Sequence, residues 1–177
     1  FITVRERYPQ GLEAVRKSVV YFERDLFNKV QWHDGNRLSL GDIMLGWILT
    51  FERADERSPL FDRSYLPSFQ SFVETFRGFR IVSENPLVAE IYSTDWTVDA
   101  ELMTGAGAFW PLYGFGPGPW HTVALGIRAE MAGRAAFTAA KATEKRVERL
   151  NYVAGPTLAI LDRELEAARN ENYIPFE

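Results

Sequence analysis

The sequence predicts an α+β fold in which helices dominate and one or two small antiparallel sheets complete the structure. Two observations support this prediction. In several segments, apolar residues recur every three or four positions, as they do along one face of a helix, whereas shorter segments alternate between apolar and polar residues, as strands do. The chain contains no internal repeat and no low-complexity segment. We therefore expect residues 1–177 to form a single α+β domain or subdomain.

The N-terminal part is expected to contain strands. Residues 1–4 are interpreted as a short strand, followed by a turn at residues 8–11. Residues 15–23 alternate in side-chain direction and include β-branched valines, so they predict a second strand. Residues 29–33 predict a third strand, which can pair antiparallel with the second through the connection at residues 25–28.

The most regular predicted element is a helix that begins after Ser39. Asp34 and Gly35 supply a turn before it, because glycine tolerates positive φ and aspartate bonds locally to the backbone. Ser39 is the expected N-cap, and Asp42 completes a shortened capping box that places negative charge near the helix start. The apolar stripe of this helix consists of Leu40, Ile43, Met44, Trp47, Ile48 and Phe51.

The middle of the chain predicts a helix followed by a hairpin. Apolar residues recur at helical spacing over residues 66–76, and Gly78 is the expected end of that helix. Residues 79–82 and 87–92 are expected to form the two strands of a β-hairpin. Residues 83–86 form the predicted connection between them.

The C-terminal part predicts more helices. Residues 95–96 and 99–103 are expected to form a short helix, and residues 120–131 are expected to form a longer one that ends at Gly133. Two further helices are expected at residues 140–153 and 156–172. In the first of these two, a solvated charged face is expected from Lys141, Glu144, Lys145 and Glu148.

Residues 104–120 form an irregular segment rich in glycine, proline and aromatic residues. Aromatic faces on such a loop suit stacking on a peptide, a sugar or an apolar partner, and they also suit covering the domain's own core. The first interpretation makes Trp110, Tyr113, Trp120 and His121 the candidate ligand-binding residues. The glycines are not followed by the Gly-Lys-Ser/Thr sequence of a phosphate-binding loop, so phosphate binding is not predicted.

Composition excludes several chemistries. The chain has no cysteine, which rules out disulfides, cysteine-based zinc sites and thiol nucleophiles. The net charge of −4 disfavours nucleic-acid binding, and no apolar run has the length of a transmembrane helix. Apolar residues at both ends, 1–2 and 174–176, predict that the chain is excised from a longer protein and exposes apolar surface through which it dimerises.

The two histidines predict neither catalysis nor metal binding. His33 and Asp34 are neighbours on an expected strand and point to opposite faces, so they do not form a catalytic dyad. His121 has no second histidine at metal-ligand spacing, and no pair of acidic residues predicts glycosidase chemistry. We therefore expect no enzyme activity, no metal and no cofactor. A hydrolase that uses either histidine is left as a distant alternative.

Residues 29–44 read Lys-Val-Gln-Trp-His-Asp-Gly-Asn-Arg-Leu-Ser-Leu-Gly-Asp-Ile-Met. This strand–turn–helix segment resembles the signature of the extracellular solute-binding proteins of family 5, the peptide, nickel and oligosaccharide receptors of ABC importers. Residues 76–92, 120–130 and 151–161 resemble other segments of that family, in the same order. The positions that carry the signature, with structural roles, are Trp32, Asp34, Gly35, Ser39 and Asp42.

The resemblance implies a bilobal receptor that closes on its ligand, of which this chain is the smaller subdomain of the first lobe. Such a protein binds a peptide or another small polar solute without catalysis, and the membrane subunits of the importer recognise its closed state. It is periplasmic or extracellular, with or without a membrane anchor. The alternative is a self-contained α+β interaction module that docks a protein or a carbohydrate through residues 104–120.

Overall fold

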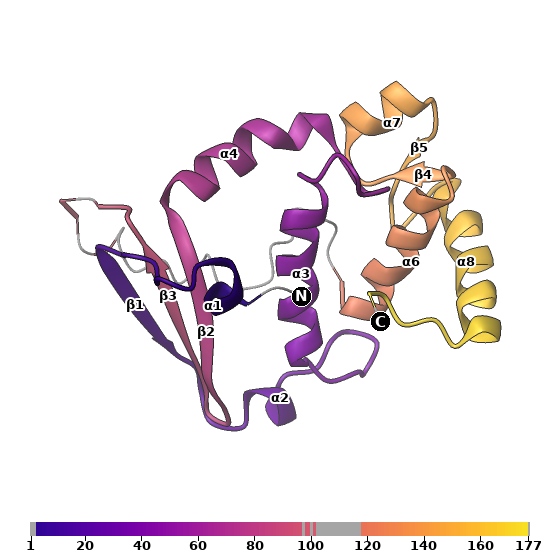
Figure 1. The fold of residues 1–177 in the computed structure, drawn as a ribbon. Helices are drawn as coiled ribbons and strands as arrows, with labels where there is room; N and C mark the ends of the chain where they lie inside the picture. Colours follow the sequence, from indigo (N-terminus) through magenta and orange to yellow (C-terminus); the bar gives the residue numbers. More distant parts are fainter. Residues whose placement is uncertain (1–2, 97, 100, 102–117, 177) are drawn as a thin grey trace.

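The computed structural model describes residues 3–96, 98–99, 101 and 118–176. They form a mixed α+β fold, which confirms the predicted class. Figure 1 shows a three-stranded sheet on one side, helices α6 and α8 on the other, and α3 between them. The helices are α1 (Val4–Arg7), α2 (Leu26–Lys29), α3 (Leu40–Glu52), α4 (Leu66–Thr75), α6 (Trp120–Met131), α7 (Ala139–Lys145) and α8 (Thr157–Glu171).

The larger sheet is antiparallel and has the strand order β1-β3-β2, with β3 in the centre. Glu90 of β3 lies opposite Val19 of β1 and opposite Arg80 of β2. A smaller sheet consists of two parallel strands, one between α6 and α7 and the other directly after α7. The strands are β1 (Arg16–Tyr21), β2 (Phe76–Glu84), β3 (Leu87–Ser93), β4 (Ala135–Ala136) and β5 (Glu148–Arg149).

Helix α3 is buried on two faces and contributes to both hydrophobic cores. The first core lies between α3 and the larger sheet, and the second lies between α3 and α6. The buried residues of the first core are Ile43, Trp47, Leu87, Ala89 and Ile91. Those of the second core are Leu45, Leu49, Leu60, Val123, Ile127 and Phe137.

Trp47 is the largest side chain in the core next to the sheet. Its ring stacks on Phe79 with centroids 4.6 Å apart and on Phe76 with centroids 5.1 Å apart. Both partners lie on β2, so the indole fixes α3 against that edge strand. Aromatic pairs of this kind contribute about 0.5–1.5 kcal/mol each beyond the area that they bury.

A buried ion pair fixes α7 against α6. The Lys141 ammonium lies 2.6 Å from one carboxylate oxygen of Glu130, and the other oxygen accepts the backbone N–H of Phe137 at 2.7 Å. Both charged side chains are buried, so the prediction that Lys141 belongs to a solvated face was wrong. The helical spacing of charges does not reveal which face of a helix is covered by another element.

The strands predicted near the N-terminus are only partly present. Residues 16–21 form β1 as expected, but their partner is β3 rather than residues 29–33. Residues 26–29 form α2, and the strand predicted at 29–33 is reduced to a single bridge between Gln31 and Arg37. The helix α1 begins at Val4, where a strand was predicted, while residues 1–2 lie outside the described residues.

The helix and hairpin predicted in the middle of the chain are confirmed with different boundaries. The helix α4 ends at Thr75 and leads directly into β2, so Gly78 does not end the helix. It lies within β2 at φ 146°, next to an irregularity in the pairing with β3. The strands extend to Glu84 and from Leu87, which leaves a connection shorter than the four residues predicted.

The helices α6 and α8 match their predictions, and Gly133 follows α6 with a positive φ of 65°. The helix predicted at 140–153 is wrong in its second half. The chain adopts a left-handed conformation at Arg146, which ends α7, and then forms β5. The short helix predicted at residues 99–103 falls largely outside the described residues. No helix in the described part of the chain is long and apolar enough to cross a membrane.

Candidate functional site

The start of α3 is bonded to the start of α6 through one buried carboxylate. An oxygen of Asp42 accepts the Ser39 backbone N–H at 2.7 Å and the Ser39 hydroxyl at 2.9 Å. The other oxygen accepts the Trp120 backbone N–H at 2.6 Å. The predicted capping interaction between Ser39 and Asp42 is therefore confirmed, and the same carboxylate also caps the first residue of α6.

The turn before α3 contacts α6 as well. The backbone N–H of Gly35 donates to the Trp32 carbonyl at 2.9 Å, and Gly35 has a positive φ of 86°, as predicted for this turn. The His121 Nε2 atom lies 2.8 Å from a carboxylate oxygen of Asp34. Hydrogen bonds from Asn36, together with the contact to His121, lower the pKa of Asp34 to about 2.

These contacts join residues for which the sequence predicted separate roles. Asp34 and Asp42 were predicted to shape a turn and a helix cap, whereas Trp120 and His121 were predicted to contact ligand. The structure brings the four residues together across 78 and 87 positions of sequence. No local pattern predicts such a contact, because capping and turn signals extend over only a few residues.

The other residues of the predicted site have different outcomes. Trp32 is half-buried beside the turn, consistent with a structural role. Trp110 and Tyr113 lie outside the described residues. Trp120 is partly buried against the core between α3 and α6, and its ring meets the His121 ring edge-on at 5.7 Å. Trp120 therefore contributes to the core and also to the surface described next.

A groove of about 290 Å³ lies between α6 and α8. Trp120 and His121 at the start of α6 line it, together with Arg169 in the last turn of α8 and Asn172, which directly follows α8. The remaining lining residues are mostly apolar, and no carboxylate is among them. Among the described residues, the lining consists of Trp120, His121, Ala124, Leu125, Leu165, Ala168, Arg169, Asn172 and Tyr173.

Trp120 also lines a second hollow of about 240 Å³, together with residues of α3 and residues that follow α8. The described lining of this hollow is more uniformly apolar than that of the groove and contains no charged side chain. Trp120 therefore contributes both to an apolar hollow and to a groove that carries polar groups. The second hollow is lined by Gly41, Met44, Leu45, Ile48, Trp120, Ile174 and Pro175.

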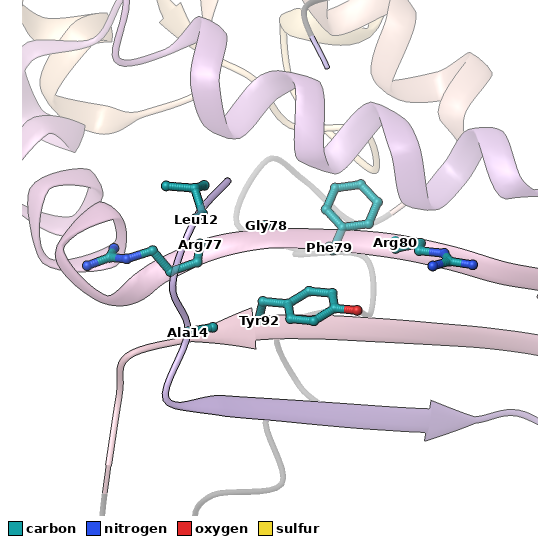
Figure 2. A pocket seen from close by; sticks show the side chains of 7 residues that line it. All are labelled: Leu12, Ala14, Arg77, Gly78, Phe79, Arg80 and Tyr92. Atoms are coloured by element: carbon teal, nitrogen blue, oxygen red, sulfur yellow. The ribbon is translucent and has the colours of Figure 1, made fainter. Parts of the chain in front are cut away.

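A third hollow, of about 260 Å³, lies on the larger sheet next to the segment before β1. Figure 2 shows Leu12 across from β2, with Arg77 and Arg80 at opposite ends. The Arg77 guanidinium donates to the carbonyls of Phe76 and Val73 at the end of α4, at 3.0 and 3.4 Å. This cation therefore caps α4 rather than facing a ligand.

The groove between α6 and α8 has the features of a small binding site. The His121 imidazole contacts Asp34 through one nitrogen, so the orientation of this ring in the groove lining is fixed. Such an imidazole can form one more hydrogen bond, through Nδ1. Within the described part of the chain, no cluster of three or more His, Asp or Glu side chains has the arrangement of a metal site.

Sequence reasoning missed the contribution of α8 to this groove. Arg169 and Asn172 lie at the end of a helix whose charged residues gave no sign of which face they occupy. Asn172 adopts a left-handed conformation with φ 51°, which is typical of a residue that ends a helix. The sequence signal for the end of α8 is the asparagine itself, and it does not predict a ligand.

Comparison with known proteins adds no assignment. No protein-family model matches the chain, and no curated protein is significantly similar to it.

Proposed function

We propose that this chain is part of the solute-binding component of an ABC importer and that it binds a peptide or another small polar solute without catalysing a reaction. In this proposal the protein acts in the periplasm or outside the cell. Solute binding stabilises a closed arrangement of the receptor, and the membrane subunits of the importer recognise that arrangement. The proposal rests on the resemblance of residues 29–44 together with the groove beside Trp120.

The observation that carries the proposal is that Trp120 and His121 line one groove with Arg169 and Asn172. Small-molecule sites are concave and mostly apolar, and a few placed polar groups orient the ligand. The groove volume of about 290 Å³ is at the small end of the range of roughly 300–1,000 Å³ that is typical of such sites. A short peptide side chain or one end of a small solute is therefore the occupant that fits.

Binding is better supported than catalysis. In a hydrolase that uses a His–Asp pair, the second imidazole nitrogen faces a serine, threonine or cysteine nucleophile. None of the described residues that line the groove is a serine, threonine or cysteine, although His121 and Asp34 lie at hydrogen-bond distance. The pair therefore supports a positioning role for the imidazole, which also links the turn before α3 to α6.

The test uses the native gene product in its own cells. An antibody against this chain recovers the product, whose cellular fraction and mass are then determined, and co-purifying small molecules are identified by mass spectrometry. We expect an exported protein that retains a peptide or another small polar solute. A cytoplasmic product that retains no solute would contradict the proposal and favour the interaction module.

Two variants connect the retained solute to the groove. Leu125→Trp adds bulk to the groove lining and is expected to abolish solute retention. Trp96→Ala is the matched control, because Trp96 is exposed and lines none of the three hollows. Circular dichroism of both variants shows whether the fold is retained. Equal solute retention in both variants would place the ligand elsewhere.

A further inference from the structure

The described residues that line the groove between α6 and α8 carry permanent charge of one sign. Among the described residues that line it, Arg169 is the one permanent cation and there is no carboxylate. Two acidic groups close to the lining residues have partners, since Asp34 contacts His121 and Glu171 forms an ion pair with Arg128 at 2.7 Å. The described lining therefore carries a positive charge, although the chain as a whole has a net charge of −4.

Arg169 differs from the other arginines on this side of the molecule. Arg128 and Arg134 both form ion pairs with the buried carboxylate of Glu164, and Arg128 also lies over the Tyr173 ring. In contrast, no carboxylate among the described residues lies within ion-pair distance of Arg169. Its guanidinium is thus available for a ligand without breaking an existing pair.

The hollow on the larger sheet provides a useful comparison. It also contains arginines, but Glu90 lies on the same face, directly opposite Arg80 and 3.1 Å from the Lys17 ammonium. Glu90 also accepts a hydrogen bond of 2.6 Å from the Tyr92 hydroxyl. The positive charge of that hollow is therefore compensated, whereas the charge of the groove between α6 and α8 is not.

We propose that this groove binds the carboxylate of a small solute that also carries an apolar or aromatic group. This inference rests on the proposed function, for which it names the solute class. The planar guanidinium of Arg169 pairs with the carboxylate, because its donor fork matches two carboxylate oxygens. Asn172 and His121 supply further hydrogen-bonding groups, and Trp120 contacts the apolar part.

The two helix ends at the groove carry partial charges of opposite sign. α6 begins there, but its partial positive charge already faces the Asp42 carboxylate, which accepts the Trp120 backbone N–H. α8 ends there, and its partial negative charge opposes an anion. Arg169 is consequently the group of the described lining that attracts an anion.

The test compares two probes of equal shape, hippurate and its neutral amide, hippuramide. Their binding to the chain is measured by isothermal titration calorimetry at low salt. A charge-assisted pair predicts that hippurate binds about tenfold or more tightly than the amide. Inorganic phosphate is the third probe, and it is expected to compete only weakly because it lacks the apolar group.

Variants on α8 assign the preference to one side chain. Arg169→Gln is expected to reduce the preference for hippurate to about twofold or less, and Arg169→Lys is expected to restore it in part. Arg163→Gln is the matched control, because Arg163 is an exposed arginine of the same helix that does not line the groove. That control is expected to retain the full preference.

Other outcomes would overturn the inference. These are equal binding of acid and amide, no binding of either probe, competition by phosphate as strong as that by hippurate, or a preference unchanged in Arg169→Gln. None of these results bears on export or on solute retention by the native product. Failure of the carboxylate assignment is therefore distinguishable from failure of the proposed function.

Discussion

Removal of the Asp42 carboxylate is expected to separate α3 from α6. The side chain is only 6% exposed, and it accepts three hydrogen bonds, two from Ser39 and one from the Trp120 backbone N–H. Replacement by alanine leaves these donors without their acceptor at the junction of two helices. We therefore expect Asp42→Ala to lower the free energy of unfolding substantially.

The magnitude of this stability loss follows from the hydrogen bonds that Asp42 accepts at the starts of α3 and α6. Loss of a capping interaction costs about 1 kcal/mol. Loss of a hydrogen bond to a charged group costs roughly 1.5–3 kcal/mol, which applies to the bond from Trp120. The expected loss for Asp42→Ala is therefore about 3 kcal/mol. Asp42→Asn retains one acceptor oxygen but cannot serve Ser39 and Trp120 together, so a loss of about 2 kcal/mol is expected.

The assay is equilibrium unfolding in urea, followed by tryptophan fluorescence and by circular dichroism. The control is Asp162→Asn, which removes an exposed carboxylate from α8 and is expected to change the stability by less than about 0.5 kcal/mol. A loss below about 1 kcal/mol for Asp42→Ala would refute the reasoning. It would mean that water replaces the carboxylate at both helix starts.

Three further substitutions have definite expected outcomes. Gly126→Ala is expected to cost about 1–3 kcal/mol in urea unfolding, because a Cβ there would collide with the Tyr152 hydroxyl and would lie 2.8 Å from the Phe137 ring. Asp34 has a pKa of about 2, below its ordinary 3.8, so its stabilising effect is complete above pH 3.8 and disappears as the pH falls towards 2. Asp34→Asn is thus expected to flatten the pH dependence of the urea midpoint in that range. Lys141→Met is expected to cost about 3–5 kcal/mol in the same assay, because it leaves the Glu130 charge buried without its partner.

Each of these expectations has its own control or contrary result. Lys145→Met removes an exposed lysine of the same helix and is expected to be nearly neutral, so similar losses at positions 141 and 145 would contradict the importance of burial. A fully stable Gly126→Ala protein would show that the neighbouring rings move without cost. An acid transition unchanged in Asp34→Asn would assign the pH dependence to other carboxylates.

Sequence patterns that extend over a few residues correctly predicted the helices that short-range interactions stabilise. The capping residues of α3 and the apolar spacing of α6 and α8 gave their positions closely, since these features depend on residues within one or two helical turns. The prediction was wrong where a contact between distant segments decided the structure. Residues 15–23 indicated a strand but not its partner. In the structure Arg16 pairs with Ser93, a residue far away in the sequence, and no local pattern specifies that register.

The candidate site illustrates the same limit. Trp120 and His121 were selected because they end an aromatic segment, and they do line a groove. Arg169, which supplies its charge, was missed, because an arginine in the last turn of a helix is a frequent solvent-exposed residue. The contact between Asp34 and His121 depends on how α3 and α6 pack, and a sequence pattern contains no information about that packing.

The position of α3 has a consequence for how the molecule unfolds. Because α3 supplies side chains to both hydrophobic cores, displacement of this helix removes packing from both cores together. We therefore expect the two halves to unfold as one cooperative unit, so that hydrogen exchange in the central strand β3 reports the stability of α6 as well. A solute bound between α6 and α8 then protects amides of a sheet that it does not touch, because stabilisation by ligand is shared by the whole unit.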